Sequence, residues 1–314
     1  KIYLEGFNNI SNIVEKLHLP SKPKVILTCS SHFTEDAFKV WMAKKANNKM
    51  SKSKIFILQH GGGPFYRFTG NIDFELNISD KFFASGKGNE IRNNIQGIGR
   101  LNYTIKKNKY NKKGQGLLVT VAMPRYCIGI RSVPIANQMH QQFESNFQFI
   151  SNLKENIRKE FIVRIYPKGD FEWKQSSRWR DKFKDINLDE GKLKMEEMVK
   201  KARLFVSTYN GTTWNESFIA NVPTIMYWDP KYWERIQGTD YVSVDDIFDD
   251  LEKNKIYHKS SISAANFINT IWNNIDDWWY TSQVQSTIEV YCRQFAINKH
   301  KGVENFVKTI QKHL

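Results

Sequence analysis

Residues 204–229 read LFVSTYNGTTWNESFIANVPTIMYWD, and this stretch decides the fold. The apolar run Leu204–Thr208 has the length of a buried strand and leads straight into the small polar residues Tyr209–Thr213. A helix begins there and ends near Pro223, and Thr224–Tyr227 is a second apolar run of strand length. Strand, helix and strand in this order predict neighbouring parallel strands of an α/β domain.

The same pattern extends over the second part of the chain. The strands expected upstream are Leu117–Ala122, Phe161–Tyr166 and Asp185–Leu188, and the expected helices are Asn137–Glu160 and Leu193–Ala202. The residues that follow Asp229 are read as mostly helical, with tryptophans that pack the helices back onto the sheet. Residues 117–314 therefore predict one complete parallel-sheet domain.

The first part of the chain repeats this alternation on a smaller scale. Its expected strands are Lys24–Cys29, Lys54–Leu58 and Phe82–Ser85, after which Ile95–Gly99 closes the region. Its expected helices are Asn8–Leu17 and about fifteen residues that follow Thr34. Leu101–Gly116 reads LNYTIKKNKYNKKGQG, which is polar, basic and typical of a linker. The predicted organisation is a piece of one α/β domain at 1–102, a linker at 103–116 and a complete α/β domain at 117–314 with C-terminal helices.

The fold class is therefore α/β, with two Rossmann-like parallel-sheet domains. Two such domains joined by a short linker are expected to leave a cleft between the carboxyl ends of their sheets, where ligands of open α/β sheets bind. The first domain has few strands for a sheet of this class, and we expect it to be incomplete.

The composition excludes some classes of protein. Hydrophobic residues make up 40% and aromatic residues 14% of the 314 residues, which excludes a disordered or fibrous chain. No apolar run approaches the roughly 18–20 residues of a membrane span, and no signal peptide begins at Lys1. The cysteines Cys29, Cys127 and Cys292 lie far apart, and we expect buried free thiols in a reducing compartment.

The chain is basic. Lys plus Arg is 47 and Asp plus Glu is 32, so the formal charge is 47 − 32 = +15. Such a charge suits nucleic acid, an anionic membrane surface or a phosphate-rich substrate, and it also fits a merely solvated surface. No zinc-finger, P-loop or RNA-binding pattern accompanies the lysines, so nucleic acid is not the expected partner.

The clearest candidate site follows the strand at Leu204–Thr208. Free N–H groups at the start of the next helix can hold a phosphate, and the hydroxyls of Thr212 and Thr213 add donors. Glu216 lies one turn further and can accept hydrogen bonds from ribose hydroxyls. The candidates for binding a nucleotide are Thr208, Tyr209, Asn210, Gly211, Thr212, Thr213 and Glu216. The alternative is an ordinary helix capped by Thr212, with Glu216 on the surface.

Arginines supply the second set of candidates. Arg125 follows the first strand of the second domain, and Arg164 lies within the next strand. Arginine makes permanently charged, bidentate contacts with phosphate, which can neutralise a departing nucleotide without a metal. For Arg164 a structural ion pair is an equal alternative. Trp173, Trp179 and Trp228 fit a sugar or base pocket, although an aromatic core is favoured.

No metal or cofactor is expected. The acidic pairs Asp245-Asp246 and Asp249-Asp250 are read as solvated helix faces, and no acidic pair stands at the end of a strand. The chemistry is therefore predicted to be independent of metal ions.

The first domain offers catalytic candidates. Gln59-His60-Gly61-Gly62-Gly63 follows a buried strand, so its glycines allow the backbone to approach a ligand and His60 can bind a phosphate or shuttle a proton. Glu35 and Asp36 follow the strand at Lys24–Cys29 and can act as a general base or nucleophile. The alternatives are a hydrogen-bonded histidine in a turn and acids that complement a helix dipole.

Several motifs carry a resemblance to known enzymes. In chain order they are KVILTCSSHFTEDAFKVWMAKKA, QHGGG, ISDKFFASG, MPRY, VRIYP, RWRD, LDEG, STYNGTTWNESFIANVPTIMYWDPKYWE and IWNNIDDWW, spread over about Lys24–Cys292. The second half resembles the donor-nucleotide half of GT-B glycosyltransferases. More specifically, the motifs resemble a bacterial family of transferases encoded with surface-polysaccharide and nonulosonic-acid genes.

The resemblance implies a fold and a reaction class. It implies that residues 1–102 are the C-terminal part of an acceptor-side domain, because members of that family extend further at the N-terminus, and that residues 117–314 form the donor-nucleotide-binding domain. It implies a GT-B glycosyltransferase that moves a sugar from a nucleotide donor to a surface glycan or lipid-linked acceptor. A CMP-linked ulosonic acid is the donor that the gene neighbourhoods suggest, and UDP- or GDP-hexoses stay open. Pro64-Phe65 departs from the aromatic-glycine pair expected after the triple glycine.

Two other functions stay open at this point. One is a transferase of teichoic-acid type that moves a polyol phosphate from a CDP donor, with His60 as its base. The other is a binding module for nucleic acid or glycans without catalysis. For the glycosyltransferase we expect a cytoplasmic protein whose positive charge also allows peripheral contact with the anionic inner membrane.

Overall fold

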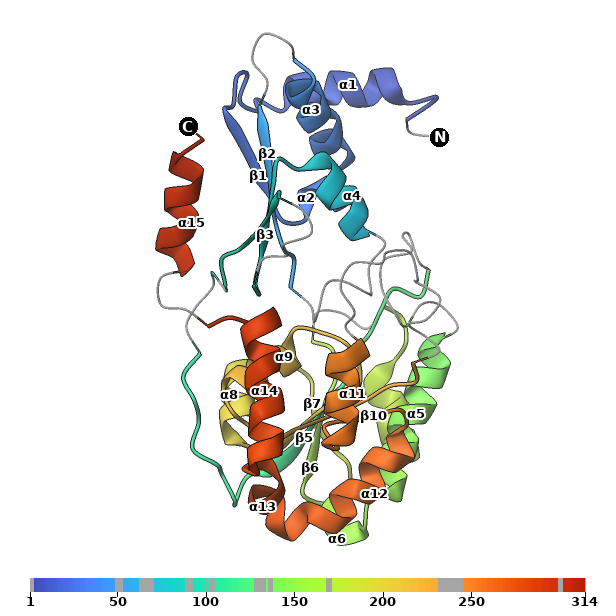
Figure 1. Cartoon of the computed structure of the whole chain (residues 1–314). Coiled ribbons are helices and arrows are strands. Elements are labelled where there is room, and N and C mark those ends of the chain that lie inside the picture. Colours follow the sequence, from blue (N-terminus) through green and yellow to red (C-terminus); the bar gives the residue numbers. More distant parts are fainter. Residues whose placement is uncertain are drawn as a thin grey trace. The chain divides into compact units, whose positions relative to one another are not determined.

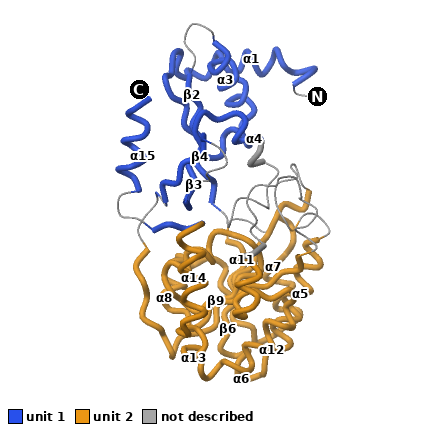
Figure 2. Tube along the Cα trace, in the orientation of Figure 1, with its two compact units in different colours: residues 1–61, 71–104, 295–314 blue, residues 62–70, 105–294 orange. Residues whose placement is uncertain are grey.

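The computed structural model describes residues 3–48, 53–61, 71–87, 93–99, 101, 105–126, 134, 138–167, 171–230, 245–298 and 302–313. The chain divides into two compact units (Figure 2). Unit 1 comprises residues 1–61, 71–104 and 295–314, and unit 2 comprises residues 62–70 and 105–294.

Unit 1 is built on a sheet of four parallel strands. Their order follows the sequence: β1 (Val25–Thr28), β2 (Lys54–Leu58), β3 (Lys81–Ala84) and β4 (Ile95–Gly97). The helices before and between them are α1 (Phe7–Lys16), α2 (Ser31–Thr34), α3 (Asp36–Ala46) and α4 (Asn71–Ile78). Ile10 and Val14 are the buried residues of α1, which packs against α3.

The last helix of the chain, α15 (Gly302–Gln311), also belongs to unit 1. Phe306 packs in the core with Phe56 and Phe83, and its ring meets that of Phe83 edge-on at 5.0 Å. Figure 1 shows α15 on the opposite side of these strands from α3. The sequence placed residues 117–314 together in the second domain, so the assignment differs for residues 295–314. The difference arises because Phe306 of this distant segment packs with the aromatic side chains of β2 and β3 in the core of unit 1.

Unit 2 contains a sheet of six parallel strands in the order β10-β9-β8-β5-β6-β7. In chain order the strands are β5 (Gln115–Val119), β6 (Phe161–Arg164), β7 (Asn187–Asp189), β8 (Ala202–Ser207), β9 (Thr224–Tyr227) and β10 (Tyr257–His258). The helices are α5 (Gln138–Asn152), α6 (Glu155–Arg158), α7 (Gln175–Lys182), α8 (Met195–Lys201), α9 (Thr213–Ile219), α11 (Asp245–Lys253), α12 (Ser261–Ile271), α13 (Ile275–Trp279) and α14 (Ser282–Phe295), with a 3-10 turn at Trp272–Asn274. The predicted fold class, α/β with two parallel sheets, is confirmed.

The order of strands reverses between β5 and β8. The chain runs from β5 outward through β6 to β7, then returns to β8 on the other side of β5 and continues outward through β9 to β10. In open α/β sheets a crevice forms outside the carboxyl ends of the two strands where the order reverses, and ligands bind in it. The segments that follow β5 and β8 are therefore the place to look for a site in unit 2.

A dense aromatic core supports this sheet. Trp179, Trp214, Trp279 and Tyr227 are fully buried, and α5 and α12 pack against each other over the sheet. Trp173 and Trp228 are 4% and 5% exposed. The favoured interpretation of Trp173, Trp179 and Trp228 as aromatic core is confirmed.

Some element boundaries differ from those expected. The helix predicted after Thr34 corresponds to α3, and a separate short helix, α2, precedes it. Glu35 separates the two helices because its backbone is extended, with φ −116° and ψ 100°. Strand β5 begins inside the predicted linker, where the ring of Phe161 packs directly against Gly116. The sequence pattern does not predict α4, α7, β4 or the two-residue strand β10.

The thiols differ from expectation in one case. Cys29 is exposed, so the expectation that it is buried is wrong. Cys292 is partly buried, and its burial raises the pKa of the thiol to about 12. Cys127 lies outside the described residues.

Candidate functional site

The strand order of unit 2 reverses between β5 and β8, and this place is called the switch point below. Thr208, the residue that follows β8, holds the two strand ends together there. Thr208 is fully buried, and its Oγ1 donates to the carbonyl oxygen of Val119, at the end of β5, over 3.1 Å. Nε2 of Gln142, on α5, donates to the carbonyl oxygen of Thr208 over 3.0 Å. These two bonds hold the ends of β5 and β8 together and fix the chain as it enters the segment Tyr209–Thr213.

A buried hydrogen-bond network holds Gln142, the residue that binds the carbonyl oxygen of Thr208. Nε2 of Gln142 also donates to Oδ1 of Asn146 over 3.2 Å, and the hydroxyl of Tyr227 donates to the same oxygen over 3.0 Å. Burial raises the pKa of Tyr227 well above its ordinary value, so its hydroxyl stays a neutral donor. Satisfied networks of this kind give one well-defined arrangement of the groups they hold.

The segment after Thr208 is shaped by a glycine. A Cβ on Gly211 would lie 2.3 Å from Cε2 of Tyr209, so only glycine lets the tyrosine ring lie across the turn. Burial raises the pKa of Tyr209, whose hydroxyl is also hydrogen-bonded to the side chain of Thr213. Oδ1 of Asn210 is buried and has no hydrogen-bond partner among the described residues. An unsatisfied buried acceptor is costly, and a ligand donor would satisfy it.

The next residues start helix α9. Thr212 is its N-cap residue but makes no side-chain capping bond, so the alternative of a side-chain cap by Thr212 is not what the structure shows. Glu216 is partly buried in the first turn of the helix. Because α9 has only seven residues, its dipole is small, and a ligand here depends mainly on specific donors.

The segment after β5 brings an arginine to the same edge. Arg125 is exposed, and its guanidinium carbon lies 5.7 Å from the ring centroid of Trp173. Trp173 itself is anchored, since its Nε1 donates to the carbonyl oxygen of Met123 over 2.7 Å. The indole therefore gives Arg125 a support while the charged group remains accessible to an anion.

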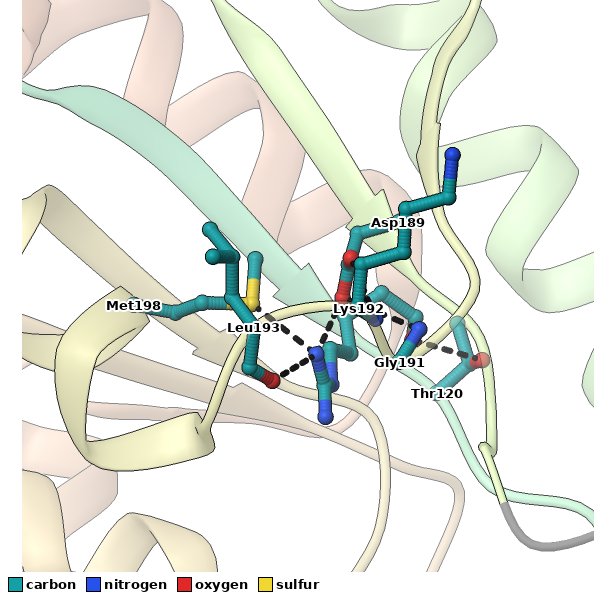
Figure 3. A network of polar contacts seen from close by, with 7 residues as sticks. Thr120, Asp189, Gly191, Lys192, Leu193 and Met198 are labelled. Carbon is teal, nitrogen blue, oxygen red and sulfur yellow. Dashed lines mark hydrogen bonds and ion pairs between the residues drawn. The ribbon is translucent and has the colours of Figure 1, made fainter.

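Arg164 has a different environment. It is 5% exposed, and its Nη1 donates to the Asp189 carboxylate, to the carbonyl oxygen of Leu193 over 2.8 Å and to Sδ of Met198 over 3.2 Å. Figure 3 shows this network, in which Asp189 also accepts from the backbone N–H groups of Gly191 and Lys192. The structural ion pair named above as the alternative for Arg164 is present. It holds the turn after β7, and a role in donor binding stays a prediction.

The catalytic candidates of unit 1 follow β1 and β2. Glu35 is exposed at the N-terminus of α3, and His60 is exposed two residues after β2. Gly61 has φ +47°, which suits glycine, and Gly62 and Gly63 lie outside the described residues. Because β1 and β2 are parallel neighbours, Glu35 and His60 come from the same edge of the sheet. Their catalytic role stays a prediction.

Asp36 is held by its neighbours. Nζ of Lys39 donates to its carboxylate over 2.8 Å, and the hydroxyl of Tyr3 donates to the same oxygen. These hydrogen bonds, that of Lys39 first, lower the pKa of Asp36. A lower pKa makes the carboxylate a weaker base, so Glu35 is the better placed of the two acids.

A buried acid–histidine pair in unit 1 is absent from the sequence-based candidates. Nε2 of His32, on α2, lies 2.7 Å from Oε1 of Glu75, on α4, and the two residues are 1% and 5% exposed. Nδ1 of His32 lies 3.4 Å from Oγ1 of Thr28, at the end of β1. The pair joins two segments 43 residues apart, so no local motif indicates it.

The described part of the chain contains neither a metal-binding cluster nor a membrane-spanning helix. Among those residues, no three His, Cys, Asp or Glu side chains are grouped so that they could hold a metal ion. No helix that the structure describes is long and apolar enough to cross a membrane.

The sequence matches a known family over nearly its whole length. The family is described as LIC12162 family transferase, and the match covers residues 1–310. Among curated proteins nothing matches.

Three solved structures show the same fold at low identity. A Listeria monocytogenes protein assigned provisionally as a UDP-N-acetylglucosamine 2-epimerase is 10% identical, with TM-score 0.55 over 98% of this chain and 79% of its own. Anabaena HepE, solved with UDP-glucose, is 8% identical, with TM-score 0.54 over 96% and 82%. The pneumococcal O-GlcNAc transferase GtfA, solved with UDP and GlcNAc, is 10% identical, with TM-score 0.50 over 97% and 59%. At these identities the likeness concerns the fold.

Proposed function

The chain belongs to the LIC12162 family of transferases, and on that premise we propose that it transfers a sugar from a nucleotide donor to a glycan or lipid-linked acceptor of the bacterial surface. One observation carries the proposal. The order of strands in unit 2 reverses between β5 and β8, and the segments after these two strands carry Arg125 and Tyr209–Glu216.

The donor phosphates are assigned to this edge of the sheet. Arg125 supplies a permanent positive charge, and the hydroxyls and backbone N–H groups around Thr212 and Thr213 supply neutral donors. The buried oxygen of Asn210 accepts from a hydroxyl or amine of the donor. Two proteins of similar fold were solved with UDP-glucose and with UDP, which supports a nucleotide as the ligand.

The donor that we favour is a CMP-linked ulosonic acid, because the motifs resemble a family encoded with nonulosonic-acid genes. For a lipid-linked acceptor, the formal charge of +15 attracts the enzyme to the anionic cytoplasmic face of the inner membrane, where such acceptors lie. A thermal-shift panel of CMP, CDP, UDP, GDP and their sugars tests the donor. A ligand at 100 times its dissociation constant stabilises the folded protein by about 2.7 kcal/mol, which is easily measured.

Replacing Thr212 and Thr213 together with valine should weaken nucleotide binding by about 1–3 kcal/mol, the typical size of lost hydrogen bonds to charged groups. Isothermal calorimetry with the nucleotide found in the panel measures the change. Thr270→Val is the control, because Thr270 is an exposed residue of α12 whose hydroxyl bonds only within its own helix, to the carbonyl oxygen of Phe267. Equal affinity of the double variant and the wild type, with both folded, would contradict the assignment of the donor phosphates to this segment.

Activity should survive EDTA, since Arg125 neutralises the departing nucleotide in place of a metal. Transfer is measured with enzyme that has been treated with EDTA and then separated from it. The assay is run once with EDTA in the buffer and once without it. Loss of activity that magnesium or manganese restores would contradict the metal-independent mechanism.

A further inference from the structure

The loop after β6 presents two stacked aromatic side chains beside the switch point. Tyr166 follows β6 by two residues, and its ring lies 6.0 Å from that of Phe171 with an angle of 25° between the planes. Phe171 is 37% exposed and Tyr166 is partly buried. A stacked pair of aromatic rings of which one is partly exposed offers a flat apolar face on which a planar ligand group can stack.

The backbone of this loop is strained. Phe171, Glu172 and Lys174 have φ values of +46°, +66° and +51°, a left-handed conformation that non-glycine residues seldom adopt. Each such residue costs of the order of a lost hydrogen bond, and strain of this kind persists where the surrounding structure enforces it and clusters at binding sites. Three such residues within four positions therefore indicate that the surrounding structure imposes this backbone conformation.

Trp173 enforces this conformation. It is buried between the strained residues, and its Nε1 donates to the carbonyl oxygen of Met123. Its own carbonyl oxygen accepts from Nε of Arg178 over 2.7 Å, and the ring of His140 meets the indole edge-on at 5.4 Å. These three contacts hold Trp173 in place. The left-handed backbone at Phe171 and Glu172 then leaves the side chain of Phe171 partly exposed to solvent.

The strand order places this pair next to the proposed donor site. Strand β5 lies between β8 and β6, so Tyr209 and Tyr166, each two residues past its strand, stand on either side of the end of β5. Arg125 rests on Trp173, which belongs to the same loop as Phe171. One ligand can thus meet the aromatic pair at one end and the guanidinium at the other.

We propose that Tyr166 and Phe171 form the stacking surface for the nucleobase of the donor. The proposal rests on the proposed function and names the part of the nucleotide that unit 2 binds with its β6 loop. Every nucleobase has a π face, so stacking gives affinity with little preference among bases. Recognition at this subsite therefore depends on an aromatic ring at position 171, and discrimination among donors depends on other contacts.

The test compares Phe171→Leu with Phe171→Tyr. Leucine keeps an apolar side chain without the ring, and tyrosine keeps the ring, so stacking predicts opposite results. The affinities of CMP, UDP, GDP, the corresponding nucleotide sugars and inorganic pyrophosphate are measured by calorimetry. We expect Phe171→Leu to bind each nucleotide about ten-fold more weakly or worse. Pyrophosphate affinity should be unchanged, and Phe171→Tyr should bind like the wild type.

The control is Tyr280→Leu, which removes an aromatic side chain of similar exposure from the end of α13 in the same unit. It should change no affinity. Unchanged nucleotide affinity in Phe171→Leu would overturn the stacking role, and so would an equal loss for pyrophosphate. A loss confined to nucleotide sugars would assign the pair to the sugar ring instead. A wild-type protein that binds none of the nucleotides would overturn the proposed function and the subsite with it.

Discussion

Glu35→Gln should lower turnover by about 10²-fold or more while the affinity for the nucleotide barely changes. Glutamine keeps the shape of the side chain but cannot accept a proton or attack a sugar carbon. Glu35 is exposed, and its extended backbone separates α2 from α3 at the carboxyl edge of the unit 1 sheet. Steady-state kinetics of transfer, combined with calorimetry of nucleotide binding, measure the two effects separately.

His60→Ala is the companion variant, because His60 follows the neighbouring strand β2. Turnover should fall in both variants if a sugar is transferred, and His60→Ala should have the larger effect if a polyol phosphate is transferred. Asp36→Asn is the matched control, since Lys39 and Tyr3 already engage the Asp36 carboxylate. Near-wild-type turnover in both Glu35→Gln and His60→Ala would contradict the catalytic role of these two residues of unit 1. It would not bear on the proposed nucleotide site of unit 2.

His32→Leu should destabilise unit 1 by about 3–5 kcal/mol, because it leaves the Glu75 carboxylate buried without its partner. Urea unfolding followed by circular dichroism measures the loss, and the transition of unit 1 is distinguished from that of unit 2 by a fluorescence probe of the tryptophan-rich core of unit 2.

The double variant His32→Leu/Glu75→Met supplies the internal check. It replaces both polar partners with apolar side chains, so it should be more stable than His32→Leu alone. Lys54→Ala is the control for an exposed ion pair in the same unit, with Asp80, and should cost much less than His32→Leu. A double variant no more stable than the single one would mean that packing of the His32 ring, and not the pair, holds α2 to α4.

Most strands of the two sheets could be predicted from the sequence, because a buried parallel strand is a short, nearly continuous apolar run. The exceptions are β4 and β10, which have three and two residues. Lys54–Leu58 and Thr224–Tyr227 match β2 and β9 at both ends. Gly116 was read as part of a linker, because a sequence does not show that the ring of Phe161 will pack against that glycine.

The candidate site was predictable only in part. Residues that follow strands could be found, since the carboxyl edge of a parallel sheet is readable from the strand pattern, and Arg125 and Thr208–Glu216 come from that reasoning. Contacts between distant segments could not. His32 and Glu75 meet across 43 residues, Arg164 finds its partner in Asp189 on another strand, and the left-handed backbone at Phe171 depends on the anchoring of Trp173.

The return of α15 to unit 1 has a consequence for the way the protein is made. During synthesis β2 and β3 leave the ribosome long before α15, and all of residues 105–294 are translated in between. Until α15 arrives, Phe56 and Phe83 lack the cover of Phe306, so unit 2 can complete its core while unit 1 still presents aromatic surface. The unit that begins the chain is thus completed after the unit that follows it. Chaperone demand should therefore centre on the face that α15 covers.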